Sequence, residues 1–379
     1  MSASITPFTL SISQSELDEL HRRLVATRWP ERETVSDWSQ GAPLDEVRSL
    51  VDYWRDHYDW RRCEARLNTL GQHVTVIDGL AIHLLHVRSP HADAIPLLLT
   101  HGWPGSIVEF IEIIGPLTDP MAHGGRVEDA FHLVMPSLPG YGFSEKPAAT
   151  GWGVEKIAGA WIELMGRLGY ARWVAQGGDW GSAVTAEIGV LAPPGCMGVH
   201  VNMASWPSLP EDRIDPTPAE QAAFERQHYF ERWDSGYAVE QRTRPQTIGY
   251  SLVDSPVGLA AWIFEKMFAW TDNAGSPFDA LSHDTILDNI MIYWLTASGA
   301  SAARLYWESA GRRRTGEVAI PSGSTAFPKE IIPAPRKWVE RRMTQLVYWN
   351  QVAKGGHFPA WEQPALFAEE LRASFSRMR

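Results

Sequence analysis

The spacing of hydrophobic and polar positions changes along this 379-residue chain. Over residues 13–29 the apolar side chains fall on one face of a helix. Ser13 with Glu16 three residues later has the spacing of a capping box, which marks a helix start. A second helix is predicted over residues 43–60. We therefore expect an N-terminal helical arm over residues 1–66, without strands.

From residue 67 the pattern becomes typical of strands. Two strand-like segments flank Asp78-Gly79, a pair typical of a two-residue hairpin turn. Continuous apolar runs, as in buried parallel strands, then alternate with helical patterns, and these runs cover residues 95–102, 131–140 and 172–178. This alternation predicts a mostly parallel sheet with helices on both faces.

The alternation stops over residues 205–310, which are mostly helical and aromatic. Strand-like runs resume at residues 318–327 and 344–350. We predict an α/β core made of residues 67–204 and 311–379, interrupted by a helical cap over 205–310.

Composition and charge limit the partners. With 34 Lys and Arg against 45 Asp and Glu, the formal charge is −11, and so acidic a chain repels nucleic acid. Cys63 and Cys196 fit no metal-ligand spacing, and we expect reduced thiols in a cytoplasmic protein. No run approaches the ~18 apolar residues of a membrane span, so no membrane anchor is expected.

The sequence VAQGGDWGSA, residues 174–183, contains candidate chemistry. Gly177 and Gly181 flank Asp179 with the spacing of a nucleophile elbow, a tight strand-to-helix turn that requires small residues. Such a turn presents the N–H of Trp180 at a helix N-terminus. Asp179 is thus a candidate nucleophile; the alternative is that it only caps the following helix.

Two further turns add to this set. THGWPGS, residues 100–106, can present the N–H of Trp103 opposite that of Trp180, and two such donors form an oxyanion hole. His357 lies in a glycine-rich turn just after a predicted strand, where it can act as a base. In the α/β-hydrolase triad the nucleophile comes first along the chain, the acid second and the histidine last, so this fold is expected.

The acid of such a triad belongs in a turn after a strand and before His357. Glu330, in TAFPKEIIPAP, meets this condition. Glu340 falls in a predicted helix and is better explained as an exposed acid. Three further candidates fall in the predicted cap and fit less well: Asp215, Asp254 and Asp279.

A carboxylate nucleophile changes the expected substrate. It suits displacement at a saturated carbon, which gives an alkyl ester. Because a carboxylate is already ionised at neutral pH, the histidine activates water, and the oxyanion hole stabilises charge on the ester oxygen. Epoxides and haloalkanes both fit, and an epoxide oxygen also needs a proton or hydrogen-bond donor.

Taken together, these residues resemble the epoxide hydrolases of the α/β-hydrolase fold, in the branch of the microsomal and juvenile-hormone enzymes. The resemblance covers nearly the whole chain, and its motifs are THGWPGS, PSLPGYGFSEKP, GGDWGS, DSPVGLAAWIFEK, FPKE and GGHF. The membrane anchor that precedes the arm in the microsomal enzymes has no counterpart, so a soluble form is expected.

The resemblance implies a triad of Asp179, His357 and Glu330. It also implies that two cap tyrosines, Tyr237 and Tyr306, hold the epoxide oxygen and donate a proton to it. A neutral phenol is able to do so at pH 7.

The assignment of Tyr237 has alternatives, the neighbouring Tyr229 and Tyr250. The family motif further implies a cis peptide bond before Pro104, which turns the Trp103 N–H inward.

The expected reaction converts an epoxide and water to a vicinal diol through a hydroxyalkyl ester of Asp179. We expect a small apolar or aryl epoxide, no metal and no organic cofactor, and a role in detoxification. Two alternatives remain: a haloalkane dehalogenase-like hydrolase, and a non-catalytic small-molecule-binding protein of the same fold. The sequence leaves a homodimer open.

Overall fold

The computed structural model describes residues 4–204, 208–311 and 316–379. Nine strands form one sheet in the order β1-β2-β3-β5-β4-β6-β7-β8-β9 within this part of the chain. From β5 to β9 along this order every pairing is parallel, whereas β1, β2 and β3 join by antiparallel pairing. The strands are β1 (Thr6–Pro7), β2 (Gln72–Ile77), β3 (Leu80–Val87), β4 (Ile95–Thr100), β5 (Phe131–Pro136), β6 (Trp173–Gly177), β7 (Cys196–Val201), β8 (Ser322–Ala326) and β9 (Leu346–Gln351).

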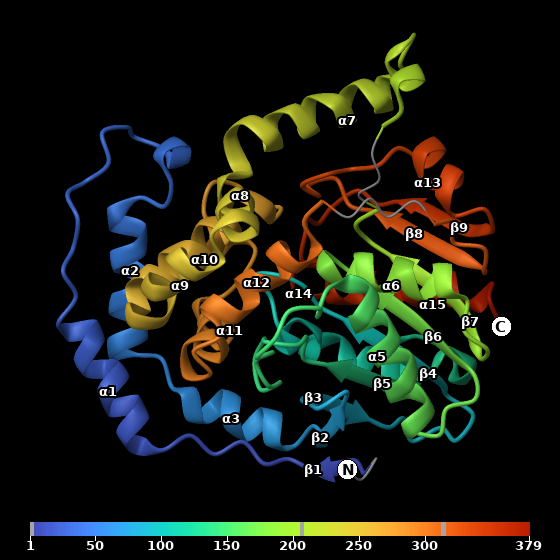
Figure 1. Ribbon diagram of the computed structural model, residues 1–379, viewed down its shortest axis with the longest axis horizontal. Coiled ribbons are helices and arrows are strands. Elements are labelled where there is room, and N and C mark those ends of the chain that lie inside the picture. Colours follow the sequence, from blue (N-terminus) through green and yellow to red (C-terminus); the bar gives the residue numbers. More distant parts are fainter. Residues whose placement is uncertain (1–3, 205–207, 312–315) are drawn as a thin grey trace.

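Helices make up most of the remaining chain (Figure 1). In Figure 1, α5 and α6 lie in front of the sheet and α15 lies behind it. The α-helices are α1 (Gln14–Val25), α2 (Leu44–Asp56), α3 (Trp60–Asn68), α4 (Ile114–Thr118), α5 (Val154–Arg167), α6 (Trp180–Leu191), α7 (Pro218–Tyr229), α8 (Gly236–Thr243), α9 (Pro245–Asp254), α10 (Pro256–Trp270), α11 (His283–Leu295), α12 (Gly299–Ser309), α13 (Arg336–Arg342), α14 (Pro359–Glu362) and α15 (Pro364–Ser376).

The predicted hairpin is confirmed. β2 and β3 pair antiparallel, with Ile77 opposite Leu80. Between them Asp78 has φ 50° and Gly79 has φ 83°. A turn with two positive φ angles matches the right-handed twist of the flanking strands, and aspartate and glycine tolerate it best.

The expectation of a strand-free arm is wrong at one point. Thr6 pairs with Val74 and Pro7 with His73, so β1 adds an antiparallel edge strand to β2. A two-residue strand has no hydrophobic period that a sequence pattern can reveal. Its proline is tolerated because an edge strand has one side without a ladder partner.

The capping box predicted at the start of α1 is present. Ser13 Oγ accepts the backbone N–H of Glu16, and the Glu16 carboxylate accepts that of Ser13.

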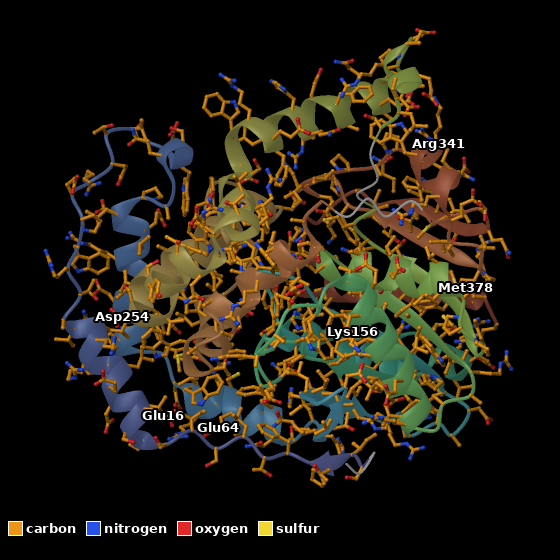
Figure 2. All side chains as sticks on the ribbon, in the orientation of Figure 1. Glu16, Glu64, Lys156, Asp254, Arg341 and Met378 are labelled. Atoms are coloured by element: carbon orange, nitrogen blue, oxygen red, sulfur yellow. The ribbon has the colours of Figure 1, made fainter. Side chains whose placement is uncertain are left out.

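The arm packs against the helices of the predicted cap. Tyr58 of the arm donates to Asp288 of α11 at 2.7 Å. Figures 1 and 2 show α1 and α2 beside α9 and α10, with Asp254 close to the arm.

The region after β7 is helical from α7 to α12, as predicted. Residues 205–207, where the predicted cap begins, lie outside the described residues, as do residues 1–3 of the arm and 312–315 of the second core segment. The division of the chain into arm, core and cap therefore stays a prediction. None of the described helices has the length and apolar character needed to cross a membrane.

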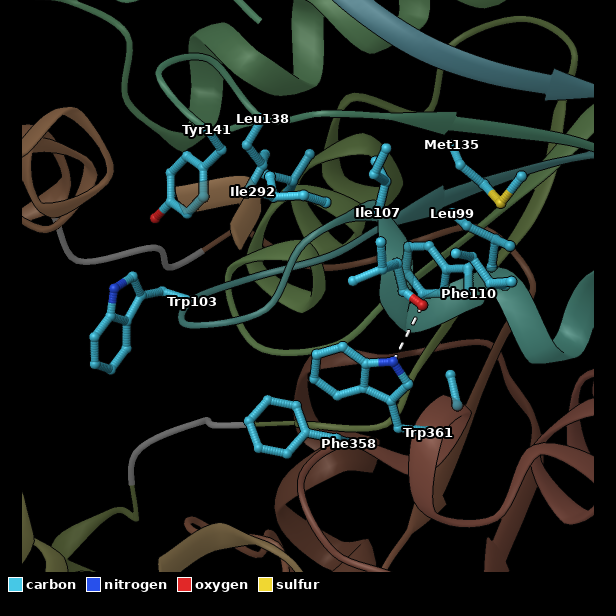
Figure 3. Close-up of a cluster of buried hydrophobic side chains, with 14 of the residues drawn as sticks. Leu99, Trp103, Ile107, Phe110, Met135, Leu138, Tyr141, Ile292, Phe358 and Trp361 are labelled. Carbon is cyan, nitrogen blue, oxygen red and sulfur yellow. Dashed lines mark hydrogen bonds between the residues drawn. The ribbon is translucent and has the colours of Figure 1, made fainter. Parts of the chain in front are cut away.

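Part of the buried core also positions the site. Figure 3 shows Leu99, Ile107 and Phe110 packed together next to α14. There Trp361 donates its indole N–H to the Val108 carbonyl at 3.1 Å. This contact joins the segment after β4 to the segment after β9, and both segments contribute residues to the surroundings of Asp179.

Candidate active site

Asp179 occupies a strained turn between β6 and α6. Its φ of 50° and ψ of −126° lie in a region that residues with a side chain rarely adopt. A Cβ at Gly177 would lie 2.0 Å from the Gly181 carbonyl oxygen, and one at Gly181 would lie 1.8 Å from that of Thr100. Only glycine fits at both positions. The Asp179 side chain makes no capping hydrogen bond to α6, so it is not held as a helix cap.

The Asp179 carboxylate faces two different groups. Its Oδ1 accepts the backbone N–H of Trp103 at 2.8 Å. Its Oδ2 lies 3.4 Å from Nε2 of His357. The Trp103–Pro104 peptide bond is cis, as predicted. The predicted oxyanion donor of the β4 loop thus lies against the predicted nucleophile, while the same role for Trp180 at the start of α6 stays a prediction.

His357 and Glu330 form a buried pair. Glu330 follows β8 and His357 follows β9, and Nδ1 of the imidazole lies 2.7 Å from Oε1 of Glu330. The backbone N–H of His357 donates to the Trp270 carbonyl at 2.8 Å. Burial alone would lower the pKa of His357, but the carboxylates of Glu330 and Asp179 outweigh it and raise that pKa well above its ordinary value.

The other predicted acids lie elsewhere. Glu340 is exposed on α13 and pairs with Arg336 at 2.7 Å. Asp254 pairs with Arg23 of the arm at 3.2 Å. Asp215 and Asp279 are not buried, and neither contacts the histidine. Of the predicted candidates, Glu330 is the one that the structure pairs with His357.

The two predicted tyrosines reach the site from α8 and α12. The ring of Tyr237 stacks on that of Trp103, with centroids 4.7 Å apart and an interplanar angle of 10°. Tyr306 lies edge-on to Tyr237 at 5.9 Å and to Trp180 at 4.8 Å. Burial raises the pKa of both phenols well above its ordinary value, and the charge of Asp179 adds to the rise. Both phenols therefore carry their proton at neutral pH.

Exposure separates Tyr237 from its two alternatives. Tyr229 is 60% exposed and Tyr250 is 71% exposed, whereas Tyr237 is 7% exposed. Only Tyr237, among these three, contacts a residue of the Asp179 site.

A small cavity adjoins Asp179 and His357. Its volume of about 10 Å³ corresponds to the space of a single water molecule. Among the described residues, two polar side-chain atoms of its lining have no hydrogen-bond partner, Oε1 of Gln176 and Nδ2 of Asn202. The cavity is thus polar, and its size is at the lower limit for one water molecule.

Sequence reasoning missed a second carboxyl group at this cavity, that of Glu109. A Cβ at Gly105 would lie 1.4 Å from Glu109 Oε1, so the missing side chain of Gly105 makes room for this carboxyl. Burial raises the pKa of Glu109 to about 8, with a contribution from Asp179 and an opposing one from His357. The available signal was an acid inside the apolar run IVEFIEII.

Sequence reasoning also missed the roles of three residues in the predicted cap, Lys266, Asp234 and Trp270. Trp270 lies edge-on to His357 with ring centroids 5.0 Å apart. Lys266 is buried and pairs with Asp234 at 2.7 Å. The signal for Lys266 was a cation inside the apolar sequence IFEKMFAW; Asp234 had none.

Comparison with known proteins assigns the family. The family described as "Epoxide hydrolase N terminus" matches residues 5–110, and the one described as "alpha/beta hydrolase fold" matches residues 95–367. A protein of Stigmatella aurantiaca named "Putative epoxide hydrolase" is 55% identical over 99% of this chain and 86% of its own length.

Two solved structures agree with this assignment. The epoxide hydrolase of Aspergillus niger superposes with a TM-score of 0.90 at 35% identity, covering 99% of this chain and 97% of that one. The juvenile hormone epoxide hydrolase of the silkworm Bombyx mori superposes with a TM-score of 0.92 at 29% identity, covering 100% of this chain and 95% of that one. The predicted fold is thereby confirmed, and the chain belongs to the epoxide hydrolases of the α/β-hydrolase fold.

Proposed function

We propose that this enzyme opens an epoxide by attack of Asp179 and then hydrolyses the resulting ester to a vicinal diol. The observation that carries the proposal is the position of the Asp179 carboxylate, with Oδ1 on the Trp103 N–H and Oδ2 facing His357. One oxygen is held in place, and the other is available to attack.

In the first half-reaction, Oδ2 of Asp179 attacks one carbon of the epoxide ring. The C–O bond of that carbon breaks, and the ring oxygen accepts a proton from Tyr237 or Tyr306. A hydroxyalkyl ester results, whose carbonyl oxygen is Oδ1. The protonated state of both phenols supports this donor role.

In the second half-reaction, a water molecule attacks the carbonyl carbon of the ester. We assign this water to the small cavity beside Asp179 and His357, whose polar lining supports the assignment. His357, oriented by Glu330, takes a proton from the water, and the N–H groups of Trp103 and Trp180 stabilise charge on Oδ1. The ester bond then breaks, the departing diol oxygen takes the proton held by His357, and the diol leaves. The second proton of the water returns to the phenolate formed in the first step, so that the Asp179 carboxylate and the phenol are both restored.

Charge links the two steps. In the free enzyme the Asp179 carboxylate helps to raise the pKa of His357. Ester formation neutralises that carboxylate, so the pKa of His357 falls just when the histidine has to act as a base. The first step thereby prepares the base for the second.

We further propose a small apolar or aryl epoxide as substrate, because aromatic rings surround Asp179. Four aromatic rings of this region are linked by ring–ring contacts, those of Trp103, Trp180, Tyr237 and Tyr306. A detoxification role fits this apolar lining. The homodimer and the cytoplasmic location stay predictions from the sequence.

The test is the intact mass of a His357→Gln variant after incubation with a panel of epoxides and chloroalkanes. This variant retains the nucleophile but lacks the base, so the ester should accumulate. We expect a mass gain equal to one whole epoxide, located on Asp179 by peptide mapping.

Two other results would change the assignment. A gain equal to a chloroalkane less HCl would indicate a dehalogenase. A folded variant that forms no adduct with any compound would favour the binding-protein alternative.

A further inference from the structure

Lys266 is a buried cation that the proposed mechanism does not use. It lies on α10, is 4% exposed and has apolar neighbours along the helix, among them Ile263, Phe264 and Met267. Its Nζ lies 2.7 Å from Oδ1 of Asp234 and 2.7 Å from Oε2 of Glu265. Burying such a pair contributes little net stability compared with apolar side chains of similar size. Its position relative to the site therefore calls for another explanation.

The ammonium group lies against the ring of a proposed proton donor. Nζ of Lys266 is 4.7 Å from the ring centroid of Tyr237 and 5.5 Å from that of Trp270. At these distances a cation is attracted by the electron-rich face of the ring. Because Trp103 stacks on the same phenol at 4.7 Å, two contacts together fix the plane of the Tyr237 ring.

Asp234 connects this cation with the histidine side of the site. It ends the short π-helical segment Phe230–Asp234 between α7 and α8. Its Oδ1 accepts from Lys266, and its Oδ2 accepts the indole N–H of Trp270 at 2.8 Å. A π-helical turn shifts the side chains that follow it, and such turns are frequent at functional sites.

We propose that Lys266, held by Asp234, is a positioning residue for Tyr237 in epoxide opening. The ammonium fixes the phenol ring and favours the partial negative charge that the Tyr237 oxygen acquires as it donates to the epoxide oxygen. This inference rests on the proposed function. It assigns the Lys266–Asp234 pair to ester formation and not to ester hydrolysis.

The test is a double variant, Lys266→Met with Asp234→Asn. Methionine keeps the length of the side chain without its charge, and asparagine keeps an acceptor for the Trp270 indole. Ester formation and ester hydrolysis are measured separately by single-turnover quench, with styrene oxide as the probe. We expect ester formation to slow about tenfold or more and ester hydrolysis to change by less than about twofold.

The same pair of substitutions in a Tyr237→Phe background separates positioning from general structural damage. If Lys266 acts through the phenol hydroxyl, most of its effect should vanish there. Lys266→Gln removes the charge but keeps a polar group that can still donate to Asp234. It should slow ester formation in the same way, and it decides the question if the double variant does not fold. Lys337→Met is the control, because Lys337 also pairs with a buried carboxylate, that of Glu220, while its own side chain is 62% exposed; it should leave both steps unchanged.

Equal slowing of both steps, or an undiminished effect in the Tyr237→Phe background, would overturn this inference. So would ester formation at the wild-type rate in the charge-free variants. Failure of the proposed function looks different, because wild-type enzyme itself would then form no ester on Asp179.

Discussion

The two sides of the site are held by different means. On the sheet side, Asp179, Glu330 and His357 follow the carboxyl ends of β6, β8 and β9. Their placement depends on glycine-rich turns and on backbone N–H groups. On the side of the predicted cap, called the cap side, Tyr237 and Tyr306 project from helices. Aromatic contacts with Trp103, with Trp180 and with one another hold them.

This difference has a consequence for catalysis. A backbone-held group loses its position only when the chain itself changes, so the sheet side gives the proposed nucleophile and base rigid positions. Side-chain contacts between helices are more easily altered one at a time. We therefore expect substitutions on the sheet side to abolish a step and substitutions on the cap side to slow one.

The largest effect is expected for Asp179→Ala. This change removes the attacking oxygen, so diol formation should fall about 10⁴-fold or more. Turnover is followed by chromatography of the diol, with circular dichroism to confirm the fold. Near-normal diol formation by this variant would exclude the proposed nucleophile.

A smaller effect is expected for Tyr237→Phe and Tyr306→Phe. Each loses one donor to the epoxide oxygen, so each should slow ester formation about tenfold, and the double variant should slow it further. Stopped-flow tryptophan fluorescence in single turnover reports the two steps separately. Tyr250→Phe, at an exposed position, is the matched control and should behave like the wild type. Slower hydrolysis with unchanged ester formation would contradict the donor role.

The smallest effect on turnover, but a clear one on stability, is expected for Glu109→Gln. Burial raises the pKa of Glu109 from 4.5 to about 8, so between these values the folded protein binds this proton more tightly than the unfolded chain. The unfolding free energy of the wild type should therefore fall as pH rises through this window.

Because glutamine does not titrate, the variant should avoid this loss. The difference in unfolding free energy, variant minus wild type, should therefore be larger at about pH 8.5 than at about pH 5, by roughly 2 kcal/mol or more. The variant is then relatively more stable at the higher pH. Urea unfolding at the two pH values measures this difference. Glu112→Gln, in the same 3₁₀-helical segment Ile107–Ile113 but exposed, should show no such change. A pH-independent difference for Glu109→Gln would mean that this carboxyl is not buried as the structure has it.

Sequence patterns predicted the sheet side better than the cap side for a physical reason. Asp179, Glu330 and His357 each follow a strand, and a strand with its turn leaves a local signature. Lys266 and Asp234, on the cap side, lie 32 residues apart in the sequence and are brought together by helix packing. A local pattern of hydrophobic and polar residues cannot predict such a contact. Tyr237 and Tyr306 were identified only through the family resemblance. β1 was missed because two residues carry no pattern.

The account depends most on one claim, that water attacks an ester of Asp179 and not the epoxide. A single turnover in ¹⁸O-labelled water, with enzyme in excess over epoxide, tests this claim directly. The account predicts that the label enters the Asp179 carboxylate and that the first diol released carries none. Label in that first diol, with none in Asp179, would contradict the account, because water would then have opened the ring itself.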